Sequence, residues 1–223
     1  MAVHPLRLHF GAELEQLRIQ VELMAVRVDQ NLERMRLVLD TGDLGTAERA
    51  LAADDDIDAM NISLMERCYD LLRRESPVAA DLRFVVSVLR VLSELERIGD
   101  LSLRVVNHAP EHALLRSGSI TFDILQAMAE EVVDRYRTAL RAWATMDLGL
   151  ATDLATTSRS MDIFFERLMH ELHRDGAADT RCALATFAVG RSLERIGDHA
   201  GIIGARLRYL ITGDTAHLVA EVR

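Results

Sequence analysis

A chain of 223 residues with 49% hydrophobic and 27% charged side chains is long enough to bury one large core or two small ones. Its formal net charge is −9 and it contains no lysine, which excludes broad contact with the phosphates of a nucleic acid. No stretch approaches the roughly eighteen uncharged apolar residues that membrane insertion requires, and no signal-peptide pattern is present, so we expect a cytoplasmic protein. Cys68 and Cys182 have no CxxC spacing and are expected to be buried free thiols.

The first half of the chain predicts three helices. Apolar residues recur every three or four positions over residues 14–39, which is typical of one long amphipathic helix. Residues 41–43, Thr-Gly-Asp, are expected to end this first helix and to start a second one. The second helix is expected to end at Ser76-Pro77. A third helix should then run over about residues 80–107.

The second half repeats this order. Residues 109–118 contain Pro110 and Gly118 and are expected to form a linker. A fourth helix carries an apolar stripe over residues 125–143, a fifth should begin near Asp147, and a sixth should span about residues 179–211. Aromatic residues make up only 4% of the chain, with three prolines and twelve glycines, which disfavours a strand-rich fold.

The stretch LERIGD occurs twice, at residues 95–100 and 193–198, a shift of 98 residues. Asp81 and Arg83 recur at the same shift, whereas residues 43–45 recur as residues 147–149, a shift of 104. We interpret the chain as a duplication of a three-helix unit, residues 1–112 and 113–223. The difference of six residues predicts a deletion between the second and third helices of the second copy, where a loop tolerates it.

Both copies of this stretch carry two acids four residues apart on one face of a helix. Glu96 and Asp100, like Glu194 and Asp198, lie about 40° apart around the helix axis. Their stripe is otherwise apolar, so we expect this face to be buried. Burying two neighbouring carboxylates costs several kcal/mol unless a cation compensates them.

The second helix of each copy also carries acids four residues apart. They are Asp54 and Asp58 in the first copy and Asp162 and Glu166 in the second. If the second and third helices of a copy pack together, these carboxylates converge on one site. Oxygen-rich clusters suit magnesium, manganese or iron, and they also accept zinc. His199 is either a group that orients such a site or an ordinary surface histidine.

The alternative interpretation is that the acids merely form surface ion pairs with Arg97 and Arg195. Each of these arginines lies about 100° around the helix from the neighbouring glutamate, which makes the pairing less favourable. Gly99 and Gly197 indicate close approach by another helix or by a ligand. The chain has no ExxH, P-loop, HExxH or GxSxG motif, so we expect no enzyme. A metal-dependent phosphoester hydrolase, using the carboxylates to activate water, is the second hypothesis.

Several segments together resemble the PhoU family of phosphate-uptake regulators. The family signature is a duplicated E(D)xxxD motif, typically ERIGD and ERIGDHA, which residues 96–100 and 194–200 match. Residues 77–83, PVAADLR, resemble the family's PVAxDLR segment, and residues 209–213, YLITG, resemble its C-terminal YLxTG. Asp58 and Asp162 match its acid positions on the second and fifth helices. The likeness covers nearly the whole chain.

The resemblance implies two three-helix bundles side by side, multinuclear metal sites on the acids, and a cytosolic, usually homodimeric, adaptor without catalysis. It implies two partners, the ATPase subunit of the phosphate transporter and a phosphate-sensing histidine kinase. Many family members carry asparagine four residues after the motif aspartate, where this chain has Arg104 and Ile202. If that asparagine helps to hold the metal, the sites here are smaller or weaker, and Arg104 supplies cation charge instead.

The sequence therefore predicts an all-α protein of six long helices that regulates phosphate uptake and phosphate-starvation signalling. The expected cofactor is a divalent or trivalent metal ion: iron, zinc, manganese or magnesium. The expected metal ligands are Glu96, Asp100, Glu194, Asp198, Asp58 and Asp162. The candidates for orienting them are Asp54, Glu166 and His199.

Overall fold

The computed structural model describes residues 5–156, 159–174 and 179–222, and this part of the chain is helical without any strand. The first half forms α1 (Pro5–Thr41), α2 (Leu44–Glu75) and α3 (Ala79–Val106). The second half forms α5 (Ser119–Thr145), α6 (Leu148–Thr156), α7 (Arg159–Arg174) and α8 (Thr180–Thr212). Short helices η1 (Ala109–Glu111) and α4 (His112–Ser117) join the halves, and η2 (Thr215–Val222) follows α8. The prediction of an all-α fold is confirmed.

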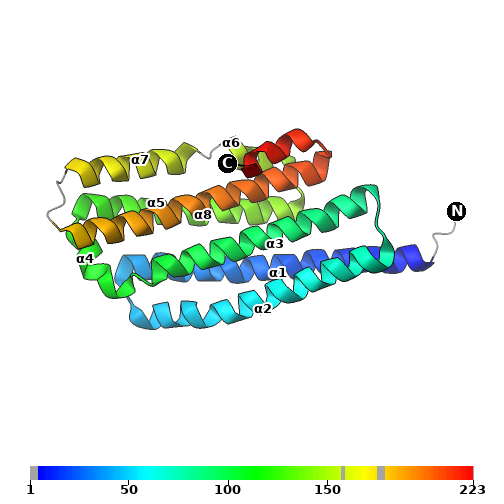
Figure 1. Ribbon diagram of the computed structural model, residues 1–223, viewed down its shortest axis with the longest axis horizontal. Helices are drawn as coiled ribbons and strands as arrows, with labels where there is room; N and C mark the ends of the chain where they lie inside the picture. Colours follow the sequence, from blue (N-terminus) through cyan, green and yellow to red (C-terminus); the bar gives the residue numbers. More distant parts are fainter. Residues whose placement is uncertain (1–4, 157–158, 175–178, 223) are drawn as a thin grey trace.

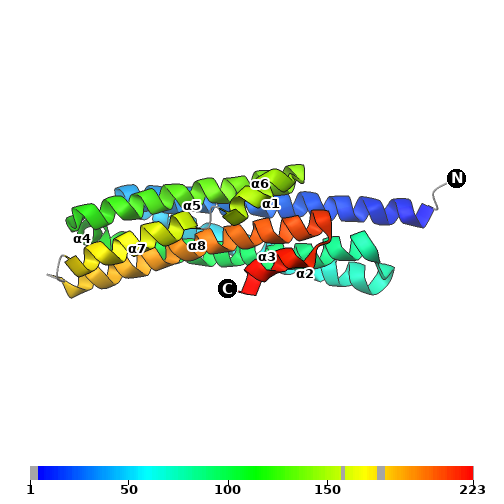
Figure 2. The same cartoon turned by 90° about the horizontal axis from the view of Figure 1, so that it is seen from above.

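The helices form two bundles that lie side by side (Figure 1). One bundle contains α1, α2 and α3, and the other contains α5, α8 and the pair α6 and α7, which together take the place of α2. Antiparallel packing of α3 on α8 forms the seam between the bundles, and α1 also contacts α5 (Figure 1). The view from above shows an elongated molecule in which α1 extends beyond its neighbours (Figure 2).

The helix starts follow from aspartate caps at matching positions of the two halves. Asp43 Oδ2 accepts the backbone N–H of Thr46 at 2.9 Å, which satisfies a free donor at the start of α2. Asp147 Oδ1 accepts the N–H of Gly149 at 2.7 Å at the start of α6. The repeated Asp-Leu-Gly landmark is therefore a helix-start signal.

One feature of the second half differs from the sequence predictions, because the linker at residues 109–118 contains the two short helices η1 and α4. The predicted fifth helix is described as α6 and α7, which lie on either side of residues 157–158, outside the described part. The structure describes α7 as far as Arg174, and the predicted site of the six-residue deletion includes residues 175–178, which also lie outside the description.

The core is shared by both bundles. Leu32 of α1, Leu92 of α3 and Leu125 of α5 are fully buried in one continuous cluster that includes residues of both halves. Each such side chain contributes about 2 kcal/mol when it leaves water. The hydroxyl of Tyr136 in α5 donates to the Ala25 carbonyl of α1 at 2.7 Å, so the buried phenol keeps a partner. The bundles therefore behave as one packed unit.

Residues 77–83 and 209–213, the two further segments that resemble the PhoU family, meet at one end of the seam between α3 and α8. Arg83 Nε, near the start of α3, donates to the Leu210 carbonyl in the last turn of α8 at 3.0 Å. A Cβ on Gly213 would lie 2.9 Å from Arg83 Nη1, and Gly213 has a φ of 76°. The left-handed backbone favours glycine at this position. The two segments are thus joined by one capping contact.

The two cysteines differ. Cys68 is fully buried, and burial raises the pKa of its thiol to about 12. Cys182 is only half-buried, because it lies in the first turn of α8, where its thiol donates to the Leu114 carbonyl at 3.3 Å. The prediction of two buried thiols is correct for Cys68 alone.

Within the described helices, none has both the length and the hydropathy needed to cross a bilayer.

Candidate functional site

The first acid cluster consists of Asp54 and Asp58 of α2 and Glu96 and Asp100 of α3. These helices pack against each other and bring the two i, i+4 pairs together. A Cβ on Gly99 would lie 3.6 Å from Asp54 Oδ1, an ordinary van der Waals distance. A methyl group at Gly99 would therefore fit beside the α2 carboxylate without displacing it.

The acids of the first cluster lie close enough together that their charges raise the pKa of Asp54 and of Glu96. Burial raises the pKa of Asp54 to about 6, with further contributions from the negative charges of Asp58 and Asp100. Burial also raises the pKa of Glu96, as does Asp100, while Arg97 opposes the rise. The leading electrostatic influences on Asp54 all come from acids, so this carboxylate is surrounded mainly by negative charge.

The second acid cluster consists of Glu131 of α5, Asp162 of α7, and Glu194 and Asp198 of α8. Burial raises the pKa of Asp198, and the charge of Asp162 adds to this rise. Burial likewise raises the pKa of Glu194, although an ion pair with Arg191 opposes it. Glu131 accepts a hydrogen bond from the Ser160 hydroxyl at 2.7 Å.

The second cluster also contains a buried arginine that sequence reasoning missed. Arg135 of α5 is 4% exposed. Its Nη2 donates to the carbonyls of Leu154 at 3.4 Å and Gly197 at 3.5 Å. The charges of Glu131, Asp198 and Asp162 favour its protonated form, while burial lowers its pKa. A permanently charged group thus lies among these acids.

The predicted acids are less buried than their apolar stripes suggested. Glu194 is buried and Asp54, Glu96 and Asp100 are half-buried. Four of the acids are exposed, which contradicts the expectation of a fully buried face: Asp58, Asp162, Glu166 and Asp198. These residues lie at the margin of the helix contacts, where a carboxylate keeps part of its hydration. Glu166 is not among the leading influences on Glu194 or Asp198.

The arginines considered in the sequence have a small role at the clusters. Arg97 Nε lies 4.0 Å from Glu96 Oε2, the outer limit of an ion pair, and its side chain is 53% exposed. Such a pair contributes little to stability. Arg104 is exposed, and it is not among the leading influences on Asp54 or Glu96. The arginine that enters an acid cluster is Arg135, on a different helix.

His199 lies between the two clusters. Its Nδ1 is 2.6 Å from an oxygen of Glu94, which is 2% exposed and also pairs with Arg90 at 3.0 Å. This contact joins α8 to α3 across the seam. His199 favours the charged forms of both Glu96 and Asp198. His199 is therefore a half-buried bridging residue, and its partner Glu94 was not among the residues singled out in the sequence.

The two clusters fit a metal ion to different degrees. The first cluster offers carboxylate oxygens, which are the donors that hard cations prefer, and the basic groups beside Glu96 are the exposed Arg97 and the half-buried His199. The second already holds a guanidinium. Among the described residues, no three His, Cys, Asp or Glu side chains are placed to hold one ion together. A metal at the first cluster would therefore have to draw the carboxylates inward.

The amino-acid sequence of this chain is similar to those of known proteins. The family model described as "PhoU domain" matches residues 21–109 and 125–207. A phosphate-specific transport system accessory protein PhoU homolog from Pseudomonas putida is 30% identical, over 96% of this chain and 86% of that protein. The Escherichia coli accessory protein PhoU is 28% identical, over 92% of this chain and 86% of that protein.

The fold is also similar to those of solved structures. The crystal structure of PhoU from Pseudomonas aeruginosa has a TM-score of 0.83 and 30% identity, covering 92% of this chain and 100% of that chain. The regulatory protein PhoU from Streptococcus pneumoniae, at 22% identity and a TM-score of 0.80, shares the fold, covering 92% of this chain and 98% of that chain. With its paired motifs and duplicated bundles, this chain belongs to the PhoU family.

Proposed function

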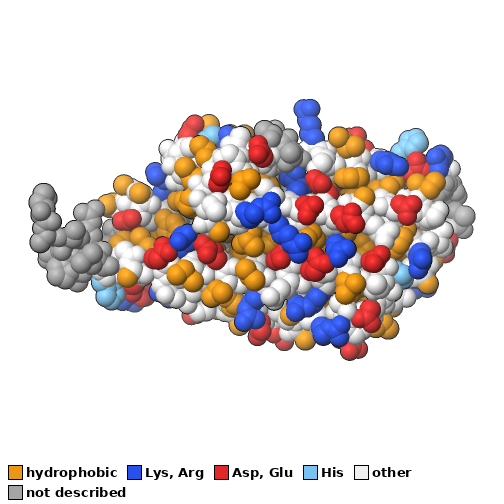
Figure 3. Space-filling view, turned by 180° about the vertical axis from the view of Figure 1, so that it is seen from behind, with side chains coloured by type: hydrophobic (Ala, Val, Ile, Leu, Met, Phe, Trp, Pro, Cys, Tyr) orange, Lys and Arg blue, Asp and Glu red, His pale blue; other side chains and the backbone are white. Residues whose placement is uncertain are grey.

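We propose that this protein regulates phosphate uptake and phosphate-starvation signalling by binding partner proteins in the cytoplasm. The observation that carries the proposal is the match to accessory proteins of the phosphate-specific transport system over more than nine-tenths of the chain. The proposed partners are the ATPase subunit of the phosphate transporter, a phosphate-sensing histidine kinase, and a second copy of this chain. Acidic and basic side chains are interspersed on the face shown in Figure 3, so a partner bound there would meet charges of both signs.

We further propose that a metal ion bound at the first acid cluster sets the regulatory state. Asp54, Asp58, Glu96 and Asp100 would hold iron, zinc, manganese or magnesium. The ion would supply positive charge that offsets the repulsion between these carboxylates. Because two of the acids lie on α2 and two on α3, they would hold these helices in one relative position. The helix pair is thus a means by which metal binding can change a partner surface.

An adaptor suits this site better than the hydrolase of the second hypothesis. A hydrolase would need an open ligand position, a substrate pocket and a positioned base in addition to the metal. The relatives are named accessory proteins, and the acids lie along a helix contact. Linkage requires that metal and partner change each other's affinity by the same factor, typically about 5 to 150-fold where sites are coupled.

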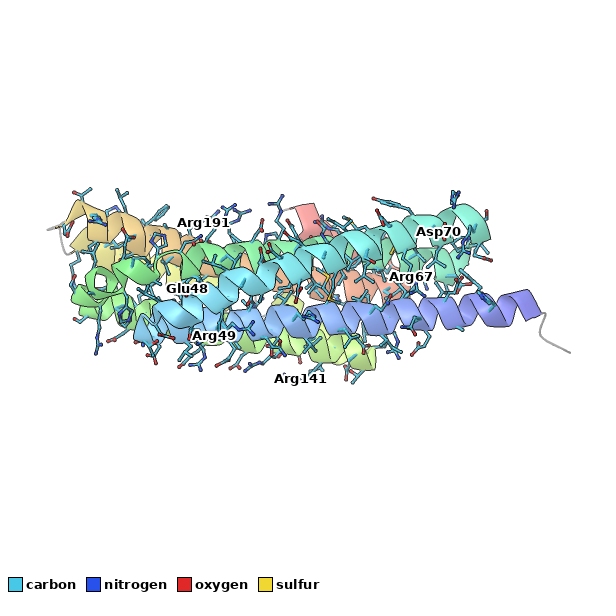
Figure 4. The ribbon with its side chains drawn as sticks, turned by 90° about the horizontal axis from the view of Figure 1, so that it is seen from below. Glu48, Arg49, Arg67, Asp70, Arg141 and Arg191 are labelled. Carbon is cyan, nitrogen blue, oxygen red and sulfur yellow. The ribbon has the colours of Figure 1, made fainter. Side chains whose placement is uncertain are left out.

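The test measures binding of the transporter ATPase to metal-loaded and chelated protein. We expect different dissociation constants, and Glu96→Gln with Asp100→Asn should remove the difference. Glu48→Gln is the matched control, because Glu48 is an exposed acid of α2 at the helix start, away from the cluster (Figure 4). Equal binding in every form would leave the metal without a regulatory role. Turnover of a phosphate ester that disappears in the double variant would favour the hydrolase.

Metal removal should lower the stability without unfolding the chain, because the apolar core does not depend on the acids. Chelation is therefore expected to lower the melting temperature while leaving the helical circular dichroism at room temperature unchanged. The Glu96→Gln, Asp100→Asn variant should show no response to chelator. Loss of the helical signal on chelation would contradict this expectation.

A further inference from the structure

The two repeats place different residues at the same point beside their acid clusters. Asn31 of α1 and Arg135 of α5 are 104 residues apart, the shift that relates the first two helices of each repeat. Asn31 Nδ2 donates to the Ala50 carbonyl at 3.2 Å, and Arg135 Nη2 donates to the Leu154 carbonyl at 3.4 Å. Ala50 and Leu154 are also 104 residues apart. One side chain is neutral and the other carries a full charge, although both occupy the same structural position.

The space beside the shared glycine is filled only in the second repeat. A Cβ on Gly197 would lie 2.7 Å from Met161 Cγ and 3.8 Å from Arg135 Nε. A Cβ on Gly99, its counterpart, would meet only Asp54 Oδ1, at 3.6 Å. The second repeat thus packs a thioether and a guanidinium where the first places a carboxylate.

A second cation reinforces the difference. Arg191 pairs with Glu194, whereas the position 98 residues earlier is Ser93. Arg191 lies at the outer edge of the bundle on α8, away from the core (Figure 4), and its side chain is 51% exposed. The second cluster therefore has one cation on its inner side and one on its outer side.

We propose that Arg135 is the resident cation of the second cluster and that metal binding is confined to the first. This inference rests on the proposed metal function of the first cluster. The guanidinium cannot lose its proton in a protein, so it compensates Asp162 and Asp198 permanently. A divalent ion entering there would meet the fixed positive charge of Arg135 and would have to displace hydrogen-bonded side-chain atoms. The duplicated motif is thus one ion site and one internal ion-pair network.

The first experiment is a metal titration of the full chain with Mn²⁺, and in parallel with anaerobic Fe²⁺, followed by measurement of bound metal. The Glu96→Gln, Asp100→Asn variant should lose the bound metal. The Glu194→Gln, Asp198→Asn variant should keep the wild-type metal content, because the second cluster holds none. Loss of metal from this second variant would overturn the inference.

Exchanging the residues between repeats provides the sharper test. Arg135→Asn should create metal binding that a further Asp198→Asn removes, and Asn31→Arg should weaken binding at the first cluster by at least about tenfold. Arg135→Gln is a second variant, since its amide keeps a donor toward the Leu154 carbonyl if Arg135→Asn folds poorly. Failure of both neutral variants to gain metal, while the wild type binds it, would overturn the inference.

A measurement without metal separates this inference from the proposed function. In chelator, Asp198→Asn should relieve the repulsion between Asp198 and Asp162 in both backgrounds, but in the wild-type chain it also removes the attraction to Arg135. The change should therefore raise the melting temperature more in the Arg135→Gln background than in the wild-type background. If no variant binds metal, the proposed metal function fails, and this difference between the two backgrounds alone then supports Arg135 as the resident cation. An equal change in both backgrounds would overturn that role.

Discussion

Two identical six-residue stretches, residues 95–100 and 193–198, lie in different environments. In the first, the glycine faces a carboxylate of α2 with room to spare, and the acids repel one another. In the second, the glycine touches Met161 of α7, and Arg135 lies beside it. The same six residues therefore border a group of carboxylates in one repeat and close packing in the other.

The helices opposite the motif explain the difference. α2 is one continuous helix of 32 residues, whereas α6 and α7 have 9 and 16 residues. α6 approaches α8 so closely that a Cβ on Gly204 would lie 2.9 Å from Leu154 Cβ and 3.1 Å from the Ala151 carbonyl. The position matching Gly204 in α3 is Val106, a buried residue with a larger side chain. Small residues on α8 therefore let α6 and α7 pack closely against it, at Gly204 and at Gly197.

The largest change in the free energy of unfolding should come from the contact between Glu94 of α3 and His199 of α8, which has no equivalent at the matching positions of the two repeats. Glu94 binds His199, but the matching positions are Ser192 and Leu101, so the duplicated seam has this polar bridge once. Glu94→Ala should lower the free energy of unfolding by about 3 kcal/mol, because Arg90 and His199 lose a buried partner. Urea denaturation followed by circular dichroism measures this.

Ser192→Ala is the matched control for Glu94, since its hydroxyl only donates to the Ala188 carbonyl of its own helix at 2.9 Å. We expect a change of about 0.5 kcal/mol. Similar effects of Glu94→Ala and Ser192→Ala would mean that the matching positions 94 and 192 contribute equally to stability, and that the contact with His199 adds nothing.

Replacing the motif glycines by alanine should give effects of opposite sign. Gly197→Ala should destabilise the fold by about 2 kcal/mol, because the new methyl overlaps Met161. Gly99→Ala should stabilise the metal-free fold by about 0.5 kcal/mol, since alanine is the better helix former and the space is free. Thermal unfolding in chelator compares the two directly. A shared sign would show that the two motif environments are equivalent after all.

A pH-dependent effect, smaller than those of Glu94→Ala and Gly197→Ala, is expected at the first cluster. The folded pKa of Asp54, about 6, is above its ordinary value of 3.8, so folding favours the protonated form. The metal-free protein therefore loses stability as the pH rises from about 4 to 6. Asp54→Asn should add about 1 kcal/mol at pH 7, after allowance for solvent screening, and nothing at pH 3.5.

Asp55→Asn is the control for Asp54, because Asp55 is the exposed neighbour in the same acid run. Denaturation at the two pH values should show a clearly smaller change. An equal gain for Asp54→Asn at both pH values would mean that the carboxylate is not repelled by its neighbours in the folded state.

The sequence was sufficient for the helices and for the acids of the first cluster. Apolar spacing and the stop signals at residues 41–43 and 76–77 predict α1, α2 and α3 to within a few residues at most ends, although α1 begins well before residue 14. Two i, i+4 acid pairs on facing stripes predict their own convergence. These signals are local, or they depend on a single helix contact.

Arg135 and the bridge between Glu94 and His199 could not be predicted in this way. Arg135 lies in an amphipathic helix rich in charged residues, and its role depends on how closely α5, α7 and α8 approach. One signal was present, because a residue-by-residue alignment of the repeats places Arg135 opposite Asn31. The division at residues 112 and 113 stays a prediction.

The continuous core across α3 and α8 has a consequence for the history of the chain. A single repeat would expose this seam and would need a second copy to cover it, which makes folding depend on concentration. In such a symmetric pair, every substitution appears twice, so an arginine in one acid cluster would appear in both. Fusion into one chain removed that constraint. Each half became free to acquire its own charge, and one gene could then encode two unlike sites.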